Sequence, residues 1–302
     1  MSGVNPEAFP SLSVIVVILG RGRHLARCLE ALRRRDGAGD AEIIVPCDDT
    51  HTVEAAMSEQ FPEAKFIPLS GKRTYAELRA AGARAARGKV IAITEDQCIP
   101  PPVWCANVLA AHTAPDAANR AAIGGPVEKL EPDRAINWAI YLRELGTYMP
   151  PVMEGPRHAL TDCNVTYKRP ALQAISDVWK EAFHEPDVHA ALEKNGGVLW
   201  LSPALLTMQQ REMQLGPALG ERYTFGRLYG GLRAASVSAV KRLVLILLSP
   251  LLPLLLVARV YATVFGKGRH IGPALLALPY VLLFAVVWGF GEFVGYLTGK
   301  SE

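Results

Sequence analysis

The chain has 302 residues, enough for one large domain or two smaller ones, and half of its residues are hydrophobic. Its formal net charge of +3 is too small to indicate binding to nucleic acid. The five cysteines are scattered and form no C-x-x-C pair, which argues against a disulfide framework and against a zinc site.

Short apolar runs alternate with helical patterns in the first third of the chain. Runs of largely β-branched residues predict buried strands at residues 11–19, 42–45, 65–69 and 90–94. Apolar residues at helical spacing predict helices between them, at residues 24–35, 52–60 and 74–87. This alternation is typical of a parallel sheet built from right-handed crossovers.

The middle of the chain continues the mixture of strands and helices. Helices are predicted at residues 104–112, 134–148 and 188–194, and strands at residues 122–130, 161–170 and 198–201. Gly124 and Gly125 interrupt the first of these strands, where the backbone could approach a ligand. The stretch at residues 208–231 is predicted to be helical in pieces, with several arginines.

Two acidic pairs follow strands of the predicted parallel sheet. Asp48 and Asp49 follow the second strand, and Glu95 and Asp96 follow the fourth. The carboxyl ends of parallel strands are where open α/β sheets bind ligands. Two such pairs along one rim favour a polar ligand with charged or hydroxyl groups.

The chain becomes strongly apolar from Leu243 onward. Residues 243–265 reach the length of a bilayer crossing if Arg259 places its charge at the interface, and Pro250 should kink this segment. Residues 271–297 are amply long. A two-span hairpin is slightly favoured over a re-entrant first segment, although the hairpin puts the basic link at residues 267–270 across the membrane from the preceding domain.

The order and spacing of these motifs resemble family 2 glycosyltransferases over roughly residues 11–233. In the resemblance, Asp48 and Asp49 match an acidic pair that contacts the nucleoside. Arg79, with Gly82 and Gly88, matches an arginine and two glycines that precede the fourth strand.

Further motifs of the resemblance lie in the second half of the matched region. Residues 95–97 occupy the place of an Asp-x-Asp motif, and the proline-rich segment up to Trp104 follows it. Asn164 also has a counterpart, and His184-Glu185 takes the place of a Glu-Asp pair ahead of a helix.

Two departures from that pattern bear on the chemistry. Gln97 offers only a neutral oxygen where the family has a second carboxylate, so a divalent cation must be carried by Asp96 or Glu95, or be held weakly. His184 replaces the first acid of the Glu-Asp pair, which leaves Glu185 as the base, on a longer arm than aspartate.

The resemblance therefore implies an α/β fold with a mostly parallel central sheet flanked by helices, followed by a C-terminal pair of hydrophobic helices. Residues 1–235 would form the catalytic domain and residues 236–302 a membrane-embedded hairpin. The implied enzyme is an inverting glycosyltransferase that uses a nucleotide-diphosphate sugar and Mg²⁺ or Mn²⁺. A cytosolic active site at the inner membrane of the cell envelope and a lipid-linked acceptor are inferred from the apolar segments.

Each residue then has an implied role. Glu185 would be the catalytic base, and Asp96 with Glu95 would hold the metal. The residues that would bind nucleotide or sugar are Asp48, Asp49, Arg79, Glu95, Asp96, Asn164 and Arg211.

Simpler interpretations remain open for several of these residues. Asp48 and Asp49 could cap the next helix, and Glu185 could be a first-turn residue without chemistry. Trp104 and Trp138 favour packing over sugar stacking. The arginines of residues 208–233 could form a solvated or lipid-facing basic surface.

Two other functions also remain open. The departures at residues 95–97 and 184 would suit a catalytically silent protein that binds a nucleotide-sugar or a partner. A nucleotidyltransferase would need a glycine-rich basic loop after the first strand, which residues 20–23 only faintly suggest.

Overall fold

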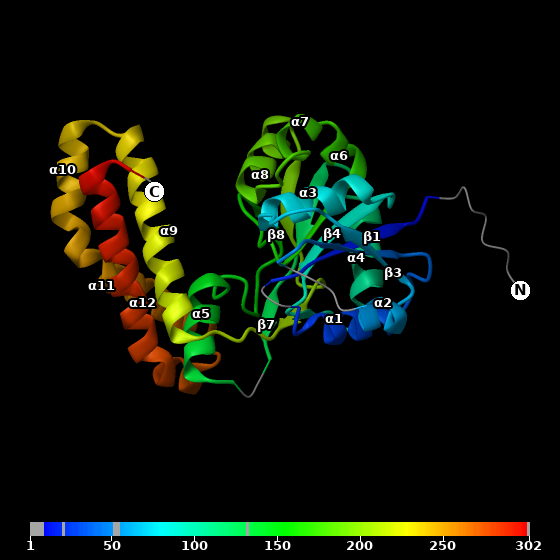
Figure 1. Ribbon diagram of the computed structural model, residues 1–302, viewed down its shortest axis with the longest axis horizontal. Helices are drawn as coiled ribbons and strands as arrows, with labels where there is room; N and C mark the ends of the chain where they lie inside the picture. The colour runs from blue at the N-terminus through cyan, green and yellow to red at the C-terminus, as the bar shows by residue number, and fades with distance from the viewer. Residues whose placement is uncertain (1–8, 20–21, 51–54, 131–132, 301–302) are drawn as a thin grey trace, which may run out of the picture. The chain divides into compact units, whose positions relative to one another are not determined.

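The computed structural model describes residues 9–19, 22–50, 55–130 and 133–300 (Figure 1). The chain forms two compact units, each built from two stretches of sequence. The first comprises Met1–Glu128 and Pro150–Gln210, and the second comprises Lys129–Met149 and Arg211–Glu302. The boundary drawn from composition, after residue 235, stays a prediction of where the catalytic part ends.

An eight-stranded sheet forms the centre of the first unit, in the order β3-β2-β1-β4-β9-β6-β10-β8. Its first four strands in that order are mutually parallel. They are β3 (Ala64–Pro68), β2 (Glu42–Cys47), β1 (Leu12–Val17) and β4 (Val90–Glu95). The apolar runs that predicted these strands are buried on both faces in β1 and β4, as a covered parallel sheet requires.

The other half of the sheet is mixed. β9 (Asn164–Lys168) lies antiparallel between β4 and β6 (Arg120–Gly124). β10 (Val198–Leu201) pairs parallel with β6 and antiparallel with β8 (Gly155–Arg157). The predicted fold class, α/β with a mostly parallel sheet, is confirmed.

Helices cover both faces of the sheet (Figure 1). Successive residues of β1 point to opposite faces, so each face of β1 packs against different helices. Val14 and Val16 share a core with α1 (Leu25–Arg33). Ile15 meets α3 (Tyr75–Ala85), where a Cβ on Gly82 would lie 2.5 Å from Ile15 Cγ2. The remaining helices of this unit are α2 (Ala55–Gln60), α4 (Trp104–Thr113), α6 (Arg169–Gln173), α7 (Ser176–Trp179) and α8 (Glu185–Lys194). The first residues of the helix predicted at 52–60 lie outside the described residues.

A small sheet in the order β5-β11-β7 contains β5 (Cys98–Ile99), β11 (Thr207–Gln209) and β7 (Val127–Lys129). The strand predicted at residues 122–130 is therefore two strands, β6 and β7, broken at Gly125. A Cβ on Gly125 would lie 1.9 Å from the carbonyl oxygen of Leu205. The close backbone approach predicted here is thus to another part of the chain.

The second unit is helical. It contains α5 (Ala135–Glu144), α9 (Leu215–Ser236), α10 (Ala239–Leu248), α11 (Leu252–Lys267) and α12 (Ile271–Thr298). The prediction of a piecewise helix at residues 208–231 was wrong, because β11 takes its start and α9 then runs unbroken to Ser236. A short 3₁₀ turn, Ser249–Leu251, stands at Pro250, where the sequence predicted a kink. Two stretches, Ala239–Lys267 and Ile271–Thr298, are long and apolar enough to cross a membrane by length and composition.

Candidate active site

The carboxyl end of β4 presents the acidic pair that the sequence singled out. Glu95 is the last residue of β4 and Asp96 follows it, and both are buried. The Asp96 backbone N–H donates to Val17 O at 2.9 Å, and the N–H of Leu19 donates to Asp96 Oδ1 at 3.0 Å. The end of the neighbouring β1 therefore fixes the Asp96 carboxyl group.

Asp96 and Gln97 both carry a buried side-chain oxygen with an unused acceptor. Among the described residues, neither Asp96 Oδ2 nor Gln97 Oε1 has a hydrogen-bond partner. Burial raises the pKa of Asp96 to about 7, against hydrogen bonds from the backbone that lower it. Buried oxygens without donors are costly, and a hard divalent cation such as Mg²⁺ or Mn²⁺ would satisfy an oxygen of this kind. The Asp96 carboxyl group therefore fits the metal, and the orphan oxygen of Gln97 would suit it as a neutral ligand.

One arginine gathers three carboxylates beside this pair. The Arg79 side chain on α3 is buried, and its Nη2 lies 2.9 Å from Asp162 Oδ2 and 3.6 Å from Glu95 Oε1. Its Nε lies 2.9 Å from Glu185 Oε1, an ionic contact without hydrogen-bond geometry. Burial lowers the pKa of Arg79, yet the surrounding carboxylates, Glu185 first, raise it above its ordinary value. Three acids around one cation leave excess negative charge, which a second cation or a proton would offset.

Glu185 is one of these three acids, and its carboxyl group is shifted toward the protonated form. Burial raises its pKa to about 7, with Asp162 adding to the rise and Arg79 opposing it. It is the first residue of α8, and His184 at the N-cap makes no side-chain cap hydrogen bond. A half-ionised carboxyl group near neutral pH is suited to accept a proton.

Asp48 and Asp49 lie at the carboxyl end of β2, on the other side of β1 from Asp96. Asp48 accepts from the backbone N–H groups of Thr50 and Arg73, and Asp49 accepts from Gly71 at 2.9 Å. Both acids therefore bind the loop between β3 and α3. The structure places the two acidic pairs on one rim, with β1 between them.

Asn164 and Trp104 serve the packing of the first unit. Asn164 is fully buried, and its Nδ2 donates to Pro126 O at 3.0 Å and to Leu205 O at 2.6 Å. Its Oδ1 accepts from Trp104 Nε1 at 3.1 Å, so the indole is turned into the core. The hydrogen bonds to Pro126 and Leu205 hold together the two stretches of the chain that meet at Gly125.

Arg211 belongs to the second unit. Its guanidinium forms an ion pair with Glu144 of α5 and lies 3.7 Å from Glu221 of α9. The predicted contact of Arg211 with a diphosphate stays a prediction.

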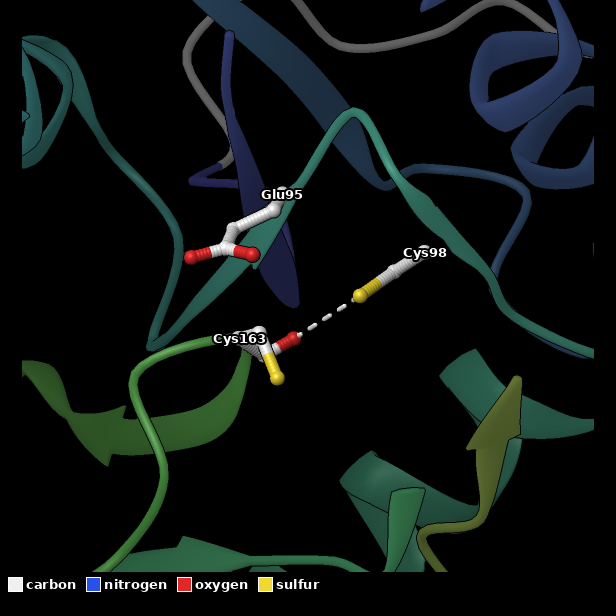
Figure 2. Close-up of side chains that lie close together, drawn as sticks. All are labelled: Glu95, Cys98 and Cys163. Atoms are coloured by element: carbon white, nitrogen blue, oxygen red, sulfur yellow. Dashed lines mark hydrogen bonds between the residues drawn. The ribbon is translucent and has the colours of Figure 1, made fainter. Parts of the chain in front are cut away.

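A cluster of Glu95, Cys98 and Cys163 escaped the sequence analysis (Figure 2). Their possible ligand atoms lie within 4.8 Å of one another, and Cys98 Sγ donates to Cys163 O at 3.5 Å. A side-chain hydrogen bond with Cys98, together with burial, raises the pKa of the Cys163 thiol well above its ordinary value. A protonated thiol is a poor ligand for a hard cation, so this cluster fits Mg²⁺ or Mn²⁺ less well than Asp96 and Gln97 do. The sequence did not reveal it, because Cys98 lies in β5 and Cys163 lies 65 positions later, in the turn before β9.

The first unit has a mixed α/β fold of the GT-A-like class, with a large central sheet flanked by helices. A mannosyltransferase from Pyrobaculum calidifontis, solved in complex with GDP-Man and Mn²⁺, matches with a TM-score of 0.53 at 14% sequence identity. The match covers 97% of this chain and 86% of that one, and at this identity it shows the fold.

The family follows from a separate comparison. The model of glycosyl transferase family 2 matches residues 13–176, more than half of the chain. The chain belongs to this family, and it is a glycosyltransferase. A search of curated protein sequences found no match.

Proposed function

We propose that this enzyme transfers a sugar from a nucleotide-diphosphate sugar to an acceptor hydroxyl with inversion at the anomeric carbon. The family and the fold neighbour, which was solved with GDP-Man, support a nucleotide-sugar donor. The two apolar C-terminal helices support attachment to a membrane. We place the active site at the cytosolic face of the inner membrane as part of this proposal. That location favours a lipid-linked acceptor.

The observation that carries the proposal is the contact between Arg79 and Glu185. Arg79 also lies near Glu95, so it links the start of α8, distant in sequence, to the acidic end of β4. The proposed base thus shares one buried cluster with Glu95, the residue that precedes the proposed metal ligand Asp96. Glu185 would take the proton of the acceptor hydroxyl as that oxygen attacks the sugar.

The other residues of the rim would hold the donor. Asp96 and Gln97 would bind a divalent cation, which when bound offsets the negative charge of the diphosphate leaving group. Glu95 is less suited to the metal, because its carboxylate already lies near Arg79. Asp48 and Asp49 would contact the nucleoside, and the loop at residues 70–73 that they order would line that site.

A second candidate is a silent protein that binds a nucleotide-sugar without transfer. The observation in its favour is that the Glu185 carboxylate is already engaged by Arg79. Turnover by purified protein separates the two functions.

The test uses the purified full-length chain in detergent with a panel of nucleotide-sugars, each with and without Mn²⁺. We expect one donor to raise the melting temperature more with Mn²⁺ present, and to be slowly hydrolysed or transferred. Asp96→Ala should remove both the Mn²⁺-dependent shift and at least 100-fold of the turnover, a loss of about 2.7 kcal/mol of transition-state stabilisation. Full activity in that variant would remove the metal role from Asp96, and donor binding without any turnover would favour the silent protein.

A further inference from the structure

Helix α9 exposes several large apolar side chains, which is unusual for a helix in contact with water. Its large exposed side chains are Leu215, Phe225, Leu228, Tyr229 and Leu232, between 37% and 60% exposed. Its two central arginines, Arg222 and Arg227, are buried or half-buried, whereas Glu221 nearer the start has a side chain that is 41% exposed and Arg233 in the last turn lies over the Tyr229 ring. A surface helix of a soluble protein has the opposite pattern, whereas charges that face the interior of a bundle are typical of membrane helices.

The buried Arg222 of α9 has a charged partner on α5. Arg222 Nη2 lies 2.7 Å from Glu144 Oε1 of α5. Beside this pair, the Arg143 guanidinium stacks over the Trp288 ring of α12 at 4.2 Å. The guanidinium of Arg222 is therefore directed toward protein, whereas the large apolar side chains of α9 are left exposed.

Glycines bring α9 into backbone contact with α12. A Cβ on Gly226 would lie 2.4 Å from Trp288 O, and one on Gly230 would lie 2.3 Å from Glu292 O. On α12, a Cβ on Gly291 would lie 2.3 Å from Tyr223 O and one on Gly295 2.4 Å from Arg227 O. Both helices thus carry a G-x-x-x-G pair in their shared interface, which is a common device for packing helices in membranes. Helix α12 runs beside α9, and α11 packs in turn on α12; all three helices carry large exposed apolar side chains (Figure 1).

Hydrogen bonds identify which ends of these helices lie together. Lys267, in the basic link between α11 and α12, donates through Nζ to Thr147 O at 3.0 Å and to Met149 O. Met149 is the last residue before the chain returns to the first unit at Pro150. At the start of α9, the Met213 N–H donates to Asn137 Oδ1 of α5 at 3.0 Å. The link and the approach to α9 therefore both lie against the segment at residues 129–149.

The segment at residues 129–149 lies on the catalytic side of any membrane. It leaves the first unit at Glu128 and re-enters it at Pro150, and its helix α5 has 10 residues, too short to cross. The other ends of the bundle meet elsewhere, since Arg242 near the start of α10 donates to Tyr296 O at 2.6 Å and Leu297 O at 2.8 Å. Basic residues occur at both ends, so these contacts and not the charge count set the orientation.

We propose that α9 is a third membrane-crossing helix, whose outward face contacts lipid hydrocarbon. Its 22 residues extend about 33 Å, enough for a hydrocarbon core of about 30 Å. The chain leaves the catalytic side along α9, returns along α10 and α11, and leaves again along α12. The basic link at residues 267–270 then lies on the catalytic side, and the C-terminus lies on the opposite side. The inference rests on the membrane location given under the proposed function, and it adds one crossing to the predicted hairpin.

Single cysteines test this topology in sealed membrane vesicles of known orientation. The native cysteines are all buried, so the unmodified chain provides the blank. Asp177→Cys, exposed on α7, marks the side of the catalytic unit. With a membrane-impermeant maleimide, Ser236→Cys and Lys300→Cys should be labelled from the side opposite to Asp177→Cys, and Arg269→Cys from the same side.

The alternatives give different labelling patterns, none of which depends on enzyme activity. A two-span hairpin places Arg269→Cys opposite to the catalytic unit and the other two beside it, and a bundle lying on the surface places all on one side. Either result overturns the proposal. Leu228→Cys, in the middle of the outward face, should stay unlabelled from both sides until detergent is added. Immediate labelling at that position would show that α9 faces water.

Discussion

At the scale of single residues, Arg79 is the cation around which three carboxylates of the first unit gather. It stands 2.9 Å from both Asp162 and Glu185 and 3.6 Å from Glu95, and its side chain is almost fully buried. Removing one partner of a buried ionic cluster is costly because the remaining charges lose their compensation. Arg79 should therefore support stability as well as the position of Glu185.

Arg79→Met should lower the free energy of unfolding at pH 8 by about 3 kcal/mol or more. The loss should shrink as the pH falls to 6. Glu185 has a raised pKa, so the folded state binds more protons than the unfolded state across this range, and without Arg79 its pKa would rise further. Denaturant unfolding at several pH values measures both effects.

Arg84→Met provides the matched control on the same helix. Arg84 is exposed, so the change should alter stability by about 0.5 kcal/mol or less. Equal losses in the two variants would mean that the carboxylates around Arg79 do not need its charge.

Glu185→Gln should lower kcat by about 10²- to 10⁴-fold, the range for loss of a general base. In the unmodified enzyme, kcat/KM should rise about tenfold per pH unit below pH 7 and level off above, because only the ionised carboxylate accepts a proton. Steady-state kinetics between pH 5 and 9 provide the measurement. Glu193→Gln, on the exposed side of the same helix, should leave kcat and its pH profile unchanged. A flat profile in the unmodified enzyme would argue against Glu185 as the base.

The sequence identified part of this site, for reasons that are specific to each residue. Glu95 and Asp96 end a clear apolar strand, and the spacing of Glu185 from Gly196 matched a family pattern. Asp162 was missed because it precedes a short strand in a loop, with no partner nearby in sequence. The orphaned Gln97 oxygen could be found only from the three-dimensional surroundings, although the residue itself was noted as a departure.

At the scale of elements, local pattern predicted best where burial is uniform. β1, β2, β3 and β4 occur where apolar runs predicted them. The predicted interruption at Gly124 and Gly125 separates β6 from β7, whereas the predicted breaks in the helix at residues 208–231 do not occur in α9. Gly226 and Gly230 serve a close helix contact, and that role depends on α12, far along the chain.

Two glycines of α9 offer a direct comparison. Gly230→Ala should lower the melting temperature of the detergent-solubilised protein, because its Cβ would lie 2.3 Å from Glu292 O and must push the helices apart. Gly220→Ala meets open space and should stabilise the protein by about 0.5–1 kcal/mol through helix propensity. Thermal unfolding of both variants measures these effects. An unchanged melting temperature in Gly230→Ala would mean that the backbones of α9 and α12 are not in contact at this position.

At the scale of the whole molecule, exposed apolar side chains are concentrated on the helices of the second unit. Ala239–Lys267 and Ile271–Thr298 remain largely uncovered by protein despite their apolar composition. Contiguous apolar surface of this extent is unusual in contact with water and typical of contact with lipid.

The protein should therefore sediment with membranes and stay there through high-salt and alkaline washes. Detergent alone should release it, because the attachment depends on apolar burial and not on charge. Immunoblotting of the washed fractions is sufficient as a readout. Release by salt alone would indicate a peripheral, charge-held protein.

The second unit takes its α5 from the middle of the chain and its other helices from the end. As the polypeptide emerges from the ribosome, α5 with its buried Trp138 and Tyr141 appears long before α12, which packs on α5 in the folded protein. The catalytic unit has all its residues by Gln210, so a nascent chain at that stage holds a complete sheet and an uncovered α5. Translation that stalls there should therefore leave an aggregation-prone intermediate. Chaperones or the membrane-insertion machinery must then shield α5 until synthesis ends.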